Sequence, residues 1–190
     1  MSTQSPVVRV TPEEYLRTEE RGEIRHELVH GQVFDRVGGT DTHNLISLNI
    51  ASGLRERLRG RPCRVFMADM KVRVAPADVF YYPDVFVTCD SRDRESYFKE
   101  YPCLIVEVLS ASTEGTDRRE KFLAYELLDS LEEYLLVQQR RREVELFRRN
   151  SPGGEWTKSV HTSVEEVAFE SLKLSLTLSQ IYEGLDLAER

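Results

Sequence analysis

The chain has 190 residues, of which 40% are hydrophobic, and a formal net charge of −7 at pH 7. This length is enough for one domain with a sizeable core, and the acidic balance argues against nonspecific coating of nucleic acid. No apolar run approaches the roughly 20 residues that span a bilayer, and the N-terminus lacks the basic-then-apolar pattern of a secretory signal. We therefore expect a cytoplasmic protein without membrane contact.

The first predicted elements are a helix and a β-hairpin. The sequence Thr-Pro-Glu-Glu from Thr11 is a helix start with a capping box, and the helix should end near Gly22. Segments 24–29 and 32–37 are rich in β-branched residues and flank a His-Gly pair, which predicts a hairpin.

A second helix and a strand-rich middle follow. Apolar residues recur at helical spacing between Thr42 and Gly60, which predicts an amphipathic helix. Segments 63–74 and 79–89 are strand-like and are separated by an Ala-Pro-Ala-Asp turn. Segment 103–109 is a further apolar strand.

The remaining chain predicts more α/β structure. Residues 116–128 should form a short helix with Thr116 as its N-cap. The other expected elements are a hairpin from 133–138 and 143–149, a strand at 155–162 and a closing helix at 174–185. Because there is no internal repeat or convincing linker, we expect an N-terminal tail at 1–10 and a single α/β domain at 11–190.

Two local features carry little functional weight. Cys63, Cys89 and Cys103 are widely spaced in apolar, strand-like runs without a CxxC pair, so we expect core thiols and neither a zinc ribbon nor a disulfide framework. The runs 92–96 and 139–149 are locally basic or mixed. Such runs are typical of solvated surfaces, although the overall acidity does not exclude a local basic groove.

The stretch HELVH, from His26 to His30, matches a zinc-protease signature. That chemistry requires a helix, whereas this stretch lies in the predicted hairpin. The extended signature also needs Gly and His where the chain has Val33 and Arg36. We interpret the match as accidental and keep a zinc hydrolase as the least favoured alternative.

A pair of carboxylates gives a stronger signal. Asp84 opens an apolar strand after a proline, and Glu107 lies inside the next one, where desolvation costs several kcal/mol unless it is compensated. A divalent cation held by both carboxylates removes that cost and their mutual repulsion. Lys121, on the same face of the following helix as Asp117, is a third element. Taken singly, Asp84 could cap a turn, Glu107 could pair with a core arginine, and Lys121 could be a surface lysine.

These residues belong to an ordered set of motifs that spans about residues 11–185. The motifs are Glu27-Leu28 with Gly31, His43-Asn44, Tyr82-Pro83-Asp84-Val85, Glu107-Val108-Leu109-Ser110, Ser112-Thr113, and Asp117 with Lys121. Their order and spacing resemble the PD-(D/E)XK nuclease superfamily, and within it a branch of small bacterial restriction endonuclease-like proteins. The superfamily's usual lysine position is Leu109 here. In the resembled branch the lysine lies on the next helix, which corresponds to Lys121.

The resemblance implies a restriction endonuclease-like α/β core, a mixed β-sheet flanked by helices, with an added N-terminal helix and β-hairpin. It also implies a Mg²⁺ (or Mn²⁺) ion held by Asp84, Glu107 and the backbone carbonyl of Val108. Phosphodiester hydrolysis agrees with such a site, since it needs an activated water and a cation over the nonbridging oxygens.

The same resemblance suggests roles for three other residues. Lys121 would orient the water or neutralise developing charge, Glu27 would hold a second metal through water or fix the site, and His43 would contact a phosphate or be satisfied by backbone. The expected protein is a metal-dependent DNA endonuclease and a homodimer. The main alternative is a nuclease-fold binding module that does not cleave, which the acidic charge modestly favours.

Overall fold

The computed structural model describes residues 9–36, 38–110, 114–162 and 166–187. The strands are β1 (His26–Val29), β2 (Gln32–Asp35), β3 (Arg64–Met67), β4 (Lys71–Val74), β5 (Val79–Tyr81), β6 (Val85–Thr88), β7 (Phe98–Lys99), β8 (Leu104–Leu109), β9 (Glu133–Gln138), β10 (Val144–Arg148), β11 (Thr157–His161), β12 (Glu166–Phe169) and β13 (Leu174–Thr177). The helical elements are α1 (Pro12–Arg21), α2 (Asp41–Arg57), η1 (Ala75–Ala77), α3 (Glu114–Thr116), η2 (Asp117–Lys121), α4 (Phe122–Tyr125) and α5 (Leu178–Ile181), of which η1 is a 3-10 turn and η2 a π-helical turn.

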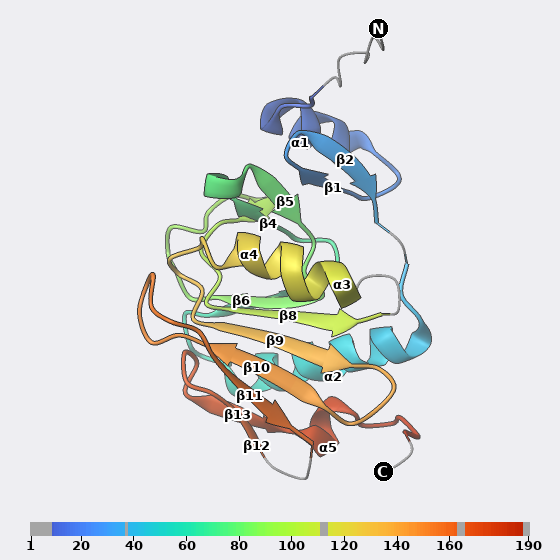
Figure 1. The fold of residues 1–190 in the computed structure, drawn as a ribbon, viewed down its shortest axis with the longest axis vertical. Helices are drawn as coiled ribbons and strands as arrows, with labels where there is room; N and C mark the ends of the chain where they lie inside the picture. The colour runs from blue at the N-terminus through green and yellow to red at the C-terminus, as the bar shows by residue number, and fades with distance from the viewer. Residues whose placement is uncertain (1–8, 37, 111–113, 163–165, 188–190) are drawn as a thin grey trace, which may run out of the picture.

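The strands form two larger mixed sheets and a small hairpin (Figure 1). The strand orders are β2-β1-β5-β4-β7, β11-β10-β9-β8-β6-β3 and β12-β13. Helices flank these sheets, as expected from the sequence for a restriction endonuclease-like α/β fold. No helix in the described ranges is long and apolar enough to cross a membrane.

The N-terminal helix and hairpin form as predicted. Thr11 and Glu14 make a capping box at the start of α1, and Gly22 ends the helix. The hairpin turn places Gly31 at a φ of 80°, where a side chain would be strained and would meet Arg9 at 2.9 Å. Val10, in the segment predicted as a tail, donates its backbone N–H to the Gly31 carbonyl at 2.9 Å; residues 1–8 of that tail lie outside the described residues.

The six-stranded sheet has buried strands β8 and β9 at its centre. β8 pairs antiparallel with β6 and parallel with β9, and every residue of β8 and β9 is buried. A strand covered on both faces needs a nearly continuous apolar run, which explains the sequence of β8. Leu104, Val106 and Val108 pack with α2, whereas Ile105 and Leu109 pack with α4. Because side chains alternate along a strand, Glu107 faces the α4 side.

Two predicted helices differ from the structure. The predicted helix at 116–128 is helical already at Glu114, and Thr116 has helical angles and is not an N-cap. Its second turn is the π-helical η2. The predicted closing helix at 174–185 is instead the strand β13 followed by the short helix α5, because the sequence LSLT alternates apolar and polar residues as a strand does.

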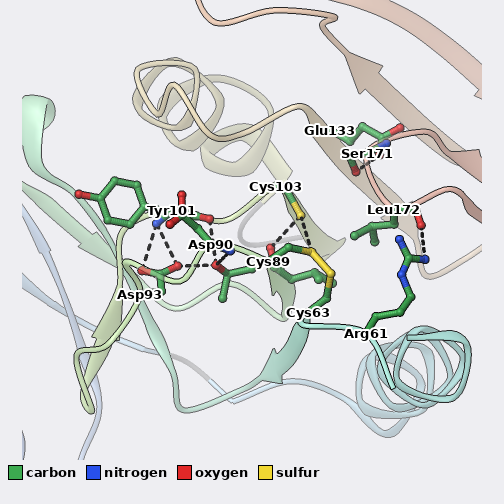
Figure 2. The surroundings of a disulfide bond; sticks show 12 residues. Arg61, Cys63, Cys89, Asp90, Asp93, Tyr101, Cys103, Glu133, Ser171 and Leu172 are labelled. Carbon is green, nitrogen blue, oxygen red and sulfur yellow. Dashed lines mark hydrogen bonds between the residues drawn. A yellow bond between two sulfur atoms is a disulfide. The ribbon is translucent and has the colours of Figure 1, made fainter. Parts of the chain in front are cut away.

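The prediction of core thiols was wrong for two of the three cysteines, whereas Cys103 is a free thiol packed against the core. Cys63 and Cys89 form a disulfide, and the Cys103 sulfur lies 3.9 Å from the Cys89 sulfur (Figure 2). The reason is strand register: β3 and β6 pair antiparallel with Arg64 opposite Thr88, so the two cysteines that flank this pair face one another. A sequence separation of 26 residues does not reveal that pairing.

An aromatic cluster packs on the helical segment that follows β8. Phe122 contacts Trp156 with ring centroids 5.4 Å apart and Phe147 at 4.9 Å. Tyr134 on β9 lies 5.6 Å from the Phe122 ring. These contacts fix α4, and with it the neighbouring η2, against the sheet.

Candidate active site

A cavity of about 870 Å³ lies where the hairpin, the start of α2, the sheet and η2 meet. Both carboxylate and basic side chains line this cavity. The ionisable residues used below are Glu27, Arg36, His43, Asp84, Glu107, Asp117 and Lys121. The site residues predicted from the sequence therefore share one cavity, although they come from distant parts of the chain.

Asp84 lies at the start of β6, in a dense set of contacts. Its Oδ2 atom accepts a hydrogen bond from the backbone N–H of Val108 at 2.7 Å and lies 3.0 Å from His43 Nε2. Its Oδ1 atom is 3.5 Å from a guanidinium nitrogen of Arg36. Because Val85 pairs with Val106 in antiparallel register, Asp84 comes beside Glu107. The Asp84 side chain thus contacts β8 directly and does more than cap a turn.

Glu107 is compensated by a lysine and a tyrosine. Lys121 Nζ lies 3.2 Å from Glu107 Oε1, and the hydroxyl of Tyr125 donates to the same oxygen at 3.1 Å. Glu107 and Lys121 are only 2% and 7% exposed, so this is a buried pair. The expected approach of the Lys121 ammonium to the Glu107 carboxylate is confirmed, and the alternatives of a core arginine and a surface lysine are wrong.

One ammonium serves three carboxylates in this site. Besides Glu107, Lys121 Nζ lies 3.1 Å from Asp117 Oδ1 and 3.6 Å from Glu27 Oε1. Asp117 is 2% exposed, and its Oδ1 accepts no hydrogen bond in the described part of the chain despite this ionic contact. Glu27 is oriented by the backbone N–H of Tyr82, which donates to Glu27 Oε1 at 3.1 Å. The local excess of buried negative charge is large.

The pKa directions agree with that excess. Burial raises the pKa of the Glu107 carboxyl well above its usual value; Lys121 opposes this, while the nearby Asp117, Asp84 and Glu27 carboxylates add to it. Burial alone would lower the pKa of Lys121, but Glu107, Glu27 and Asp117 together raise it well above the usual value. A positive charge at this point is therefore strongly favoured.

His43 and Val108 complete the predicted set. The His43 ring is aimed at Asp84 through Nε2, and it packs so closely on Gly39 that a Cβ there would lie 2.7 Å from His43 Nδ1. Val108 gives its N–H to Asp84. Since the N–H and C=O of one extended residue point to the same strand edge, the Val108 carbonyl faces the Asp84 side of β8.

Sequence reasoning missed three contacts. Arg36 reaches Asp84 from the end of the hairpin and also donates to the Ala68 carbonyl at 3.2 Å, but no motif marks it. Tyr125 could have been found from its spacing, because it follows Lys121 by one helical turn. The sequence places Asp117 on the same helix face as Lys121 but gives no sign that its carboxylate is buried.

The zinc signature does not form its site. Residues His26–Val29 are the strand β1, so the helix that a zinc hydrolase would need is absent from this part of the structure. His26 Nδ1 instead lies 3.1 Å from Glu19 Oε2. Nowhere in the described ranges are three or more His, Cys, Asp or Glu side chains grouped as ligands of one metal.

Comparisons with known proteins identify relatives of the whole chain. The sequence profile of the Uma2 family, described as "Putative restriction endonuclease", matches residues 12–185. An uncharacterized protein of Synechocystis sp. is 38% identical over 185 residues, which cover 97% of each chain. A second uncharacterized protein of that organism is 32% identical over 143 residues, covering 74% of this chain and 81% of its own length.

A solved structure extends the likeness to the fold. The crystal structure of a "putative nuclease belonging to DUF820" from Anabaena variabilis matches with a TM-score of 0.75 at 19% sequence identity. The match covers 91% of this chain and 97% of that chain. The motifs, the fold and the family match lead to one conclusion: the chain belongs to the Uma2 family, within the restriction endonuclease-like PD-(D/E)XK superfamily.

Proposed function

We propose that this protein is a metal-dependent DNA endonuclease that hydrolyses phosphodiester bonds in the cavity around Asp84, Glu107 and Lys121. The single observation that carries the proposal is the buried contact of 3.2 Å between Lys121 Nζ and Glu107 Oε1, beside Asp84. A buried ion pair is weak evidence for stability on its own, so its position in an open cavity favours a functional reason for keeping it.

The donor set fits a hard divalent cation such as Mg²⁺ or Mn²⁺. Asp84 and Glu107 would hold it with the Val108 carbonyl, and the buried Asp117 Oδ1, which accepts no hydrogen bond from any described residue, is consistent with a site short of positive charge. Mg²⁺ usually takes one or two protein carboxylates and completes its shell with water and phosphate oxygens. When bound, the ion would polarise the phosphate and lower the pKa of a coordinated water.

Lys121 and Glu27 would prepare the attack. The Lys121 ammonium is a compact donor in contact with three carboxylates, among them Glu107, so it would lie beside a phosphate bound in the cavity and stabilise negative charge on its oxygens or position a water. Glu27 keeps that ammonium in place and is itself fixed by the backbone of Tyr82. Glu27 is therefore a positioning residue in this proposal.

Arg36 and His43 would bind the substrate phosphate. In the described contacts both are held near the Asp84 carboxylate, at 3.5 and 3.0 Å. Both side chains line the cavity beside Asp84, so they would be placed to contact the phosphate of an anionic ligand bound there. A homodimer would present two such sites, which suits the cleavage of both DNA strands.

Plasmid cleavage with Mg²⁺ or Mn²⁺ tests the proposal. Wild type should convert supercoiled DNA, whereas Asp84→Ala, Glu107→Ala and Lys121→Ala should lose at least about a hundredfold in rate. Lys158→Ala is a control, because Lys158 is an exposed lysine that does not line the cavity. Equal activity in all variants would refute the proposal. Metal binding without cleavage by wild type would favour the non-cleaving module.

A further inference from the structure

The turn between β9 and β10 carries three consecutive arginines, Arg140–Arg142. β8 and β9 run parallel with Glu107 opposite Leu136, so this turn leaves the sheet at the same end as the cavity. In Figure 1, the tips of β8 and β9, the first turn of α2 and the helix α3 all lie on the right side of the view. This arginine turn therefore lies next to the candidate active site.

A glutamine fastens the turn to the rim of the cavity. The side-chain amide of Gln139 donates to the Leu109 carbonyl at 2.9 Å, and its oxygen accepts from the Thr40 hydroxyl at 2.8 Å. Leu109 ends the strand that carries Glu107, and Thr40 is the N-cap of α2 and lines the cavity. The turn is thus held in a fixed place relative to the carboxylates.

Arg140 and Arg141 of this turn are available to a ligand. Arg140 is exposed and has no ion pair or side-chain hydrogen bond with any described residue. Arg141 makes one ion pair, with Glu143 at 2.6 Å, and is 44% exposed. Arg142 keeps a buried Nε donor that no described group satisfies. Together the turn has more positive charge than its own acidic partner neutralises.

We propose that this arginine turn binds the DNA backbone at phosphates that flank the scissile bond; the inference rests on the proposed function. Arg140 follows Leu136, the register partner of Glu107, by four residues, of which the last two lie in the turn, so the two Cα atoms are at most about 13 Å apart. Each DNA strand carries one phosphate per 3.4 Å of helix axis, so the arginines reach about four nucleotides from the cleavage site. This explains how a chain with a net charge of −7 binds a polyanion.

The test compares two matched double variants in binding and cleavage. Arg140→Ala/Arg141→Ala removes two charges at the turn, and Arg55→Ala/Arg59→Ala removes two exposed charges at the other end of α2, about 25 Å from Thr40. Binding to a 20-base-pair duplex is followed by fluorescence anisotropy without divalent metal, at several salt concentrations. Cleavage of the same duplex with Mn²⁺ gives kcat and KM separately.

The turn variant should raise Kd at least about fivefold at low salt and reduce the slope of log K against log salt by about 2. It should raise KM and leave kcat unchanged, and the α2 variant should match wild type. If both double variants bind and cleave equally while wild type cleaves, the inference is overturned and the proposed function stands. If wild type neither binds nor cleaves the duplex, the proposed function fails, and the inference with it.

Discussion

At the scale of single residues, the site depends on one ammonium shared by several acids. Lys121 contacts Glu107, Asp117 and Glu27, and all of these contacts are removed from water or nearly so. In such surroundings the loss of one partner leaves the others uncompensated, which costs more than the net stabilisation from the intact pair. Lys121 should therefore matter for folding as well as for chemistry.

Replacing Lys121 with methionine should separate these two effects. Lys121→Met keeps the volume but leaves buried carboxylates unpaired, so the free energy of unfolding should fall by about 3 to 5 kcal/mol in urea titrations. Lys121→Met/Glu107→Gln should recover part of that loss, because one of the acids is neutralised, and should remain inactive in cleavage.

Lys158→Met is the matched control for stability. Lys158 pairs with Glu145 and its side chain is 47% exposed, and the buried Glu145 keeps a second ion pair with Arg118 at 2.6 Å, so the loss of Lys158 should cost about 1 kcal/mol or less. A cost for Lys121→Met as small as that of the control would mean that the three-carboxylate contact does not hold the site together.

The residue level was also where sequence reasoning was most and least informative. Glu107 could be found because a carboxylate inside an apolar strand demands a partner, and Asp84 and Lys121 followed from the motif order. Arg36 could not be identified as a site residue, because the sequence of a hairpin does not show which distant residue the side chain at its end will contact. The roles of all these residues remain predictions.

At the scale of elements, the sequence predicts most helices and strands, but not the strand register that brings distant residues together. Strand types, the first hairpin and α2 were predictable from periodicity and turn residues. The π-helical turn η2 was not predictable, because a widened turn has no residue signature, whereas the apolar and polar alternation of LSLT in β13 favoured a strand over the predicted helix. The pairing of β3 with β6 likewise sets Cys63 opposite Cys89, a relation invisible in their spacing.

Thiol counting checks the disulfide. Denatured protein without reductant should show one reactive thiol, Cys103, and three after reduction. Reduction should lower the free energy of unfolding by about 3.5 kcal/mol, as expected for a loop of this length. Three thiols before reduction would contradict the bond.

In the folded protein Cys103 should react slowly. Burial raises its pKa from 9.0 to about 12, so little thiolate exists at pH 8. Because the folded pKa is the higher one, the stability that this thiol contributes is complete below pH 9 and is lost as the pH rises toward 12.

At the scale of the whole molecule, metal binding should be visible as stability. A ligand that binds only the folded chain, at a concentration a hundredfold above its Kd, raises the free energy of unfolding by about 2.7 kcal/mol. This corresponds to an increase of roughly 5 to 10 °C in Tm for a chain of this size. Mn²⁺ should therefore raise the Tm of wild type in a thermal-shift experiment. Glu107→Gln should lose most of the rise, and NaCl at equal ionic strength should give none. An identical rise in wild type and variant would place the ion elsewhere.

The aromatic cluster on α4 gives the molecule an optical property. Trp156 is the only tryptophan in the sequence, and its ring packs edge-on against Phe122, the residue after Lys121. Its fluorescence emission should therefore report whether the segment that carries the lysine is seated on the sheet. Undocking of that segment would expose the indole to water and shift the emission to longer wavelength, so the assembly of the site can be followed without any added label.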